Sequence, residues 1–276
     1  MSVAEYGVAT PLMGDMPRGR ALQVIVEAGF RHVELWTAPG HLDDWITGPA
    51  GLRRDLDRLG LTPFSVHSPS NGWHTADSDP EVRRAAVEAT CKSLEWAAEV
   101  GAGVVVVHPS SSREEENPAG PKLARARSRE SLSIFAERAG ELGLMIAVEN
   151  LPIRKHKFRP GTTVADVLGL IDGLGDHVGV CLDAGHSNLN GLDPAEEAAL
   201  AGDKLFTMHL QDNDRSGDQH LAPGRGTVNW DAVLGVLNQM GYTGGRMFEV
   251  GAGEAGVEQT LNALAQIRDR WLSPQA

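Results

Sequence analysis

Short runs rich in β-branched and apolar residues alternate along the chain with longer segments in which apolar residues recur at helical spacing. The first pattern is typical of buried strands and the second of amphipathic helices. The alternation runs through eight repeats. The predicted strands are Val3 to Ala9, His32 to Trp36, Thr62 to His67, Val104 to His108, Met145 to Glu149, Val178 to Asp183, Leu205 to Leu210 and Arg246 to Val250.

Local signals mark the ends of the helices between these strands. The run Asp79-Pro80-Glu81 supplies a capping carboxylate, a first-turn proline and a favourable first-turn charge. Gly101 then predicts the end of that helix, because glycine readily adopts the left-handed conformation of a helix stop. The same glycine signal precedes other predicted strands at Gly29, Gly60 and Gly143.

Repeated strand and helix units favour a parallel α/β sheet, and eight of them favour its closure into a (β/α)₈ TIM barrel. An open, doubly wound sheet is the alternative. A length of 276 residues suits one complete barrel, and no low-complexity linker divides the chain. The sequence therefore predicts a single barrel domain over residues 1–276.

Composition narrows the function classes. A net charge of −12 argues against electrostatic binding to nucleic acid, because phosphate binding depends on clustered Lys and Arg. The two cysteines, Cys91 and Cys181, stand alone in apolar or helical contexts and predict neither disulfides nor a Cys-rich zinc site. Without a signal-peptide pattern or an apolar run of about 18 residues, we expect a cytoplasmic protein with no membrane segment.

Most predicted strands finish in a residue type that binds metal ions. In a barrel the carboxyl ends of all strands meet at one mouth, so these side chains should converge there. Each one alone is more often a hydrogen-bonded turn residue. A ring of buried carboxylates would repel itself unless a cation neutralised it, and this need predicts a metal. The residues are Glu34, His67, His108, Glu149, Asp183, His209 and Glu249.

Two loops add further candidates. In the run Cys181-Leu182-Asp183-Ala184-Gly185-His186, the imidazole follows the strand-end aspartate by three residues, so both can face the mouth. The glycine-containing loop after the seventh strand carries Asp218 and His220. A solvated loop is the competing interpretation of this second pair.

These motifs together resemble the xylose isomerase-like barrel superfamily, which contains sugar isomerases and epimerases, inosose isomerases and dehydratases, and endonuclease IV. The resemblance extends over almost the whole chain. It is carried by the strand-end residues His67 and His108 and by the motifs Val33-Glu34-Leu35-Trp36, Ala147-Val148-Glu149-Asn150, Cys181-Leu182-Asp183-Ala184-Gly185-His186, Met208-His209-Leu210-Gln211-Asp212-Asn213 and Phe248-Glu249.

The resemblance implies a ligand set. In the ketose epimerases, one Mn²⁺, Co²⁺ or similar ion is held at the positions that match Glu149, Asp183, His209 and Glu249 here. In endonuclease IV, three zinc ions use nine positions, all of which find a match in this chain. We therefore expect one divalent ion (Mn²⁺, Zn²⁺ or Co²⁺) and up to three. The nine positions are His67, His108, Glu149, Asp183, His186, His209, Asp218, His220 and Glu249.

The leading functional prediction is an isomerase or epimerase of a small sugar, sugar phosphate or inosose-like ketone. The metal would stabilise an enediolate, and Glu149 and Glu249 would remove and return the proton. A dehydratase or lyase could use the same first step. Two further hypotheses are a zinc phosphodiesterase of the endonuclease IV type and a metal-containing barrel without turnover.

Substrate contacts are assigned on position alone. Glu34, Trp36 and Trp73 are candidate substrate-binding residues, with His74 and His156 as weaker ones. We interpret the basic run from Arg154 to Arg159 first as a solvated loop and otherwise as a contact for a sugar phosphate. A small carbohydrate is the expected partner, nucleic acid is not expected, and relatives of this kind are usually homodimers or homotetramers.

Overall fold

The computed structural model describes residues 5–38, 41–42, 48–70, 74–109, 120–154 and 159–273. Eight parallel strands hydrogen-bond in chain order, and β8 pairs with β1 to close the sheet into a barrel. The predicted (β/α)₈ barrel is therefore confirmed. The strands are β1 (Glu5–Ala9), β2 (His32–Trp36), β3 (Thr62–His67), β4 (Val104–Val107), β5 (Met145–Glu149), β6 (Val178–Asp183), β7 (Leu205–His209) and β8 (Gly245–Phe248).

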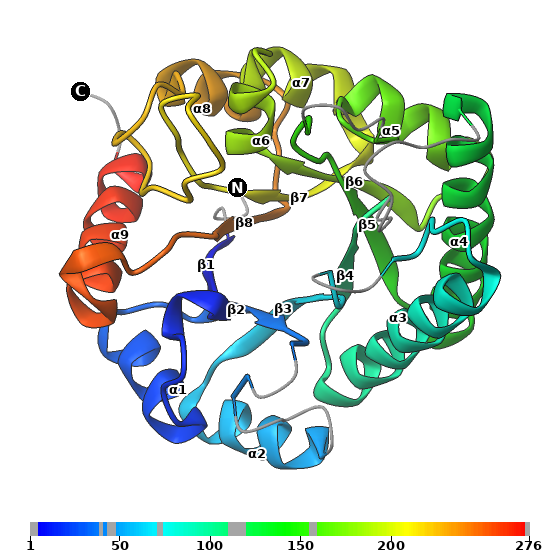
Figure 1. The fold of residues 1–276 in the computed structure, drawn as a ribbon. Helices are drawn as coiled ribbons and strands as arrows, with labels where there is room; N and C mark the ends of the chain where they lie inside the picture. Colours follow the sequence, from blue (N-terminus) through cyan, green and yellow to red (C-terminus); the bar gives the residue numbers. More distant parts are fainter. Residues whose placement is uncertain are drawn as a thin grey trace.

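Helices surround the strands when the molecule is viewed along the barrel axis (Figure 1). The α-helices are α1 (Arg18–Glu27), α2 (Pro49–Leu59), α3 (Pro80–Val100), α4 (Gly120–Leu142), α5 (Val164–Ile171), α6 (Ala184–Leu189), α7 (Pro194–Ala201), α8 (Trp230–Gln239) and α9 (Val257–Leu272). Short 3₁₀ turns are η1 (Thr10–Met13), η3 (Gly202–Lys204) and η4 (Gly253–Ala255). In the described part of the chain, no helix is long and apolar enough to cross a membrane.

The helix signals at α3 act as expected. The Asp79 carboxylate accepts a hydrogen bond from the backbone N–H of Glu81, and Pro80 occupies the first helical position. Gly101 ends the helix with a φ of +84°, a conformation that is costly for residues with a Cβ. These two ends fix where β4 begins and so place its carboxyl end at the barrel mouth.

Some strand ends differ from the prediction by one or two residues. Pairing of β8 stops at Phe248, which lies opposite Val8, and Glu249 therefore stands just beyond the strand. Likewise β4 ends at Val107, so His108 begins the following loop. Both side chains keep their place at the mouth because they directly follow the last paired residue. The predicted start of the first strand at Val3 lies outside the described residues.

The barrel interior is filled below the mouth. Val104, Val106, Ala147 and Cys181 form a buried inner cluster, with the rings of Phe64 and Phe206 packed against it. Space beside these rings is so tight that a Cβ on Gly245 would lie 2.3 Å from a ring carbon of Phe64. The interior between the two ends of the barrel is therefore a packed core, and the cavity that the strand-end donors line lies toward the carboxyl ends of the strands. Burial raises the pKa of the Cys181 thiol, so it stays protonated.

Candidate metal centre and cavity

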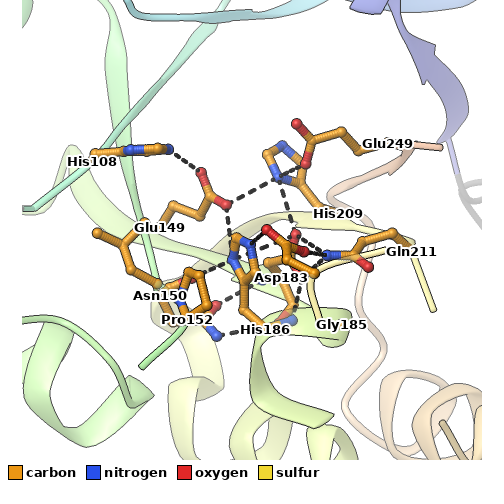
Figure 2. Close-up of polar contacts among 12 residues, drawn as sticks. His108, Glu149, Asn150, Pro152, Asp183, Gly185, His186, His209, Gln211 and Glu249 are labelled. Atoms are coloured by element: carbon orange, nitrogen blue, oxygen red, sulfur yellow. Dashed lines mark hydrogen bonds and ion pairs between the residues drawn. The ribbon is translucent and has the colours of Figure 1, made fainter. Parts of the chain in front are cut away.

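Four donor side chains from neighbouring strand ends converge at the mouth. Glu149, Asp183 and His209 are the last residues of β5, β6 and β7, and Glu249 follows β8 directly. One donor atom from each lies within 4.8 Å of the others. Figure 2 shows the carboxylates facing the imidazole of His209. Parallel register produces this grouping, since Glu149 is paired with Cys181 and Asp183 with His209 across the adjacent strands.

The His209 ring tests whether this group suits a metal ion. Its Nδ1 atom lies 2.9 Å from Oε2 of Glu249, 3.6 Å from Oε1 of Glu149 and 3.8 Å from Oδ2 of Asp183. Although the ring is fully buried, neither Nδ1 nor Nε2 makes a hydrogen bond of good geometry with any described residue. A buried nitrogen beside three carboxylate oxygens is a donor set that suits Mn²⁺, Zn²⁺ or Co²⁺. The four residues therefore fit a divalent cation.

Glu34 supports His209 from the opposite side. Its Oε1 atom lies 2.9 Å from Nε2 of His209, and its Oε2 accepts a hydrogen bond from the Ser65 hydroxyl at 2.7 Å. A carboxylate behind a ligating imidazole fixes the orientation of the ring. Glu34 is buried and does not line the cavity described below. Its position indicates a supporting role and gives no evidence of substrate contact.

A second group surrounds the other oxygen of Glu149. The Nε2 atoms of His67 and His108 lie 3.2 and 3.0 Å from Glu149 Oε2. The Nδ1 atom of His67 faces the carbonyl oxygen of Ser68 at 2.8 Å, so that nitrogen carries a proton. Burial opposes the charged ring, but the hydrogen bond and charge of Glu149 outweigh it and raise the pKa of His67 to about 9. Burial lowers the pKa of His108.

A third group brings the two loop motifs together. Asp218 lies between two imidazoles, 3.2 Å from Nε2 of His186 and 3.4 Å from Nε2 of His220. The other ring nitrogen of His220 faces the carbonyl oxygen of Glu249 at 2.9 Å. Its φ of +48° is unusual for a residue with a Cβ, which indicates that surrounding contacts hold this backbone in place. The interpretation of Asp218 and His220 as a purely solvated loop is therefore wrong.

The charges of the three groups depend on one another. Burial disfavours the ionised carboxylates, and it alone would raise their pKa values. The nearby imidazoles reverse this effect for Glu249, whose pKa falls to about 2, and hold the pKa of Glu149 well below its usual range. For Asp183, burial dominates and raises the pKa to about 6. Without a bound cation, His186 and His209, whose pKa values are raised well above the usual value, supply positive charge to these carboxylates.

Gln211 links two of the groups and was missed by the sequence analysis. Its Nε2 amide donates to Asp183 Oδ1 at 3.1 Å (Figure 2). It also donates to Asp218 Oδ1 at 3.0 Å. A Cβ at Gly185 would lie 2.1 Å from Gln211 Oε1, so only glycine leaves room for the amide. Nothing in the surrounding motif from His209 to Asp212 indicates that the side chain of Gln211 turns inward.

A cavity of about 410 Å³ opens above these groups. Apolar side chains, among them Pro11, Leu12 and Trp36, form one part of its lining. Arg154 and Arg159 also line it, so the interpretation of the basic run as a purely solvated loop is wrong for the half-buried Arg159, whereas Arg154 is exposed as well as lining the cavity. The cavity also reaches His67, His108, Glu149, His186, Asp218, His220 and Glu249.

The remaining candidate substrate contacts differ in whether they line the cavity. Trp36 lines the cavity and lies edge-on to the ring of His41, at 5.6 Å between centroids. His74 is described but does not line the cavity. Trp73 and His156 lie outside the described residues.

Known proteins share this fold and parts of this sequence. A D-tagatose 3-epimerase-like protein superposes with a TM-score of 0.85 at 25% identity, over 97% of both chains. An uncharacterised protein of Methanocaldococcus jannaschii is 32% identical over 65% of this chain and 61% of its own length. A probable endonuclease 4 of Thermoplasma acidophilum is 23% identical over 83% of this chain and 81% of its own length. The family model described as xylose isomerase-like TIM barrel matches residues 22–267, and the chain therefore belongs to this family.

Proposed function

We propose that this protein is a divalent-metal-dependent isomerase or epimerase of a small carbohydrate ketone. The observation that carries the proposal is the group Glu149, Asp183, His209 and Glu249 beneath a cavity of about 410 Å³. A cavity of this size suits a small molecule better than a polymer. The similarity to a D-tagatose 3-epimerase-like protein supports the same class. The substrate would be a sugar, a sugar phosphate or an inosose-like ketone.

The four side chains would hold one Mn²⁺, Zn²⁺ or Co²⁺ ion. When bound, such a cation supplies positive charge that stabilises an oxyanion developing on the substrate. Asp183 suits a purely ligating role, because it is fully buried and both of its oxygens face Gln211 at 3.1 and 3.3 Å. The orientation of His209 is set by Glu34 on its far side.

Glu249 and Glu149 would move the proton on the carbon beside the carbonyl. Glu249 is the better placed, because its side chain is 15% exposed toward the cavity and its Oε2 is the atom that faces His209. The two oxygens of Glu149 face imidazoles on both sides. Proton transfer at Glu149 therefore requires that Oε2 moves away from His67 and His108. A base must reach the carbon-bound proton to act.

Solvent exchange tests this proposal directly. The protein loaded with Mn²⁺, Co²⁺ or Zn²⁺ would be incubated in D₂O with ketoses, ketose phosphates and inososes, and carbon-bound deuterium measured by NMR. We expect metal-dependent deuterium incorporation beside a carbonyl, with an isomer as product. Loss of water from the product would identify a dehydratase. Absence of exchange across all three substrate classes would contradict the proposal.

A zinc phosphodiesterase is the second candidate. The observation that favours it is the completeness of all three ligand groups, because His67, His108 and Glu149 and then His186, Asp218 and His220 could each hold a further ion. The similarity to a probable endonuclease 4 points the same way. We expect no nicking of abasic-site DNA at catalytic rates. A rapid nick that disappears in His209→Ala would replace the epimerase proposal with this one.

A further inference from the structure

Two arginines line the cavity beside the candidate metal centre, and neither has a carboxylate partner among the described residues. They are Arg154 and Arg159. The Nη1 atom of Arg159 donates to the carbonyl oxygen of Pro152 at 3.1 Å, and the remaining N–H groups of the fork can serve a ligand. In the described ranges, neither guanidinium lies within ion-pair distance of an Asp or Glu. Glu149 and Asp218 attract the Arg159 guanidinium from beyond ion-pair distance, so among the described residues the two arginines have no direct ion-pair partner.

Holding the charge of Arg159 here has an energetic cost. Burial, followed by repulsion from Arg154, lowers the pKa of Arg159 to about 10. The guanidinium still carries its charge near neutral pH, but it does so partly removed from water and beside a like charge. An anion placed between the two arginines would relieve both effects and accept charge-assisted hydrogen bonds.

The arginines also have a fixed position relative to the apolar lining. They follow β5, whereas Pro11 and Leu12 follow β1 and Trp36 ends β2. In a closed barrel of eight strands in chain order, β5 lies across the mouth from β1 (Figure 1). The arginines therefore stand across the cavity from the apolar side chains that follow β1 and end β2, while Leu151 and Pro152 add apolar surface beside them. Such a cavity favours a ligand with an anionic end and orients it in one direction.

We propose that Arg154 and Arg159 form an anion-binding subsite, so that the carbohydrate substrate carries a phosphate or carboxylate group away from its reacting carbon. The planar fork of arginine matches the oxygens of either group. This inference rests on the proposed function, and it narrows the substrate to sugar phosphates or sugar acids. A neutral sugar carries no negative charge, so it could not act as a counterion for the guanidinium of Arg154 or Arg159.

The test uses three ligands that differ at one carbon. D-Fructose, D-fructose 6-phosphate and D-fructuronate share a ketose chain and end in a hydroxyl, a phosphate and a carboxylate. Their binding to the Mn²⁺-loaded protein would be measured by calorimetry, and deuterium exchange would be followed in parallel. We expect at least one anionic ligand to bind about ten- to a hundredfold more tightly than fructose, since hydrogen bonds to charged groups contribute on this scale. The anionic ligand that binds more tightly shows whether the subsite prefers a phosphate or a carboxylate.

Variants of the two arginines test whether these side chains cause the preference for an anionic ligand. Arg159→Met and Arg154→Met should each reduce the preference about tenfold, while Arg159→Lys should retain part of it because the charge remains. Arg58→Met removes an exposed arginine from the last turn of α2 and should leave the preference unchanged. Circular dichroism would show that each variant is folded.

The outcomes for the subsite and for the function are distinct. Equal binding of all three ligands by the parent protein would overturn the subsite, and so would an undiminished preference in Arg159→Met. Exchange on fructose without any such preference would leave the proposed function standing and remove the subsite. An arginine-dependent preference with no exchange on any ketose would uphold the subsite and count against the isomerase.

Discussion

The indole Nε1 of Trp230 donates a hydrogen bond to Oδ2 of Asp212 at 3.0 Å. Asp212 is fully buried, and its two oxygens also accept hydrogen bonds from the backbone N–H groups of Asn213, Gly224 and Val228. The carboxylate therefore ties together both ends of the loop that carries Asp218 and His220. An anchored loop is what allows two residues between β7 and α8 to join a site built on other strands.

Replacement of Asp212 by asparagine should loosen this loop. The new amide would face two N–H donors in either orientation, so two buried donors would lose their acceptor. We expect a loss of about 2 to 4 kcal/mol in the free energy of unfolding, measured by urea denaturation. Asp214→Asn is the matched control, because Asp214 is exposed on the same loop. Equal stability of the two variants would show that the anchor is unimportant.

Metal content should depend on His209. The parent protein should bind one divalent ion per chain after reconstitution, and His209→Ala should lose it, because the only nitrogen donor of the four-residue group is removed. His177→Ala is the control, since His177 contacts the carbonyl oxygen of Ala136 outside the candidate site. Content would be measured by inductively coupled plasma mass spectrometry. Close to three zinc ions per chain would instead favour phosphodiester chemistry.

Substitution of Glu249 by glutamine should abolish deuterium exchange. The amide cannot accept the substrate proton, so we expect a rate loss of about a hundredfold or more in the parent reaction. Glu254→Gln replaces an exposed carboxylate in η4 and should exchange normally. Because Glu249 is also a candidate ligand, metal content must be measured on the same sample. Full exchange in a metal-loaded Glu249→Gln variant would leave Glu149 as the base.

Metal binding should release protons and strengthen as pH rises. In the metal-free protein, burial opposes the charged form of His209, but the nearby carboxylates Glu34, Glu249 and Glu149 outweigh it and hold the pKa of His209 well above its usual value, so the ring is protonated near neutral pH. Below this raised pKa, a proton occupies the His209 ring and competes with the metal ion for it. We expect the dissociation constant to fall up to about tenfold per pH unit between about pH 6 and 8. Calorimetry in buffers of different ionisation enthalpy would count the protons, and a pH-independent affinity would contradict this expectation.

The strand-end residues could be predicted because two simple regularities place them. The hydrophobic periodicity and the turn signals of the sequence locate β5, β6 and β7. Closure of the barrel then brings Glu149, Asp183 and His209 to one rim. Neither regularity requires any knowledge of how a loop is folded. The nine positions matched by family resemblance accordingly fall into the three groups found in the structure.

Loop residues could not be predicted in the same way. Whether Arg159 faces water or the cavity depends on contacts such as the one to Pro152 O, which no periodicity encodes. The same holds for Gln211, whose inward orientation depends on the missing side chain of Gly185. Glu34 illustrates a related limit, because its sequence position did not reveal that it would stand behind His209.

The candidate ligands are divided unequally between the two halves of the barrel. The four-residue group, the group of His186, Asp218 and His220, and the two arginines all come from the chain after α4, whereas the first half adds His67, His108 and the apolar side chains of Pro11, Leu12 and Trp36. Sequence change in the first half can therefore reshape this apolar part of the cavity while the residues of the proposed cation site and anion subsite stay unchanged.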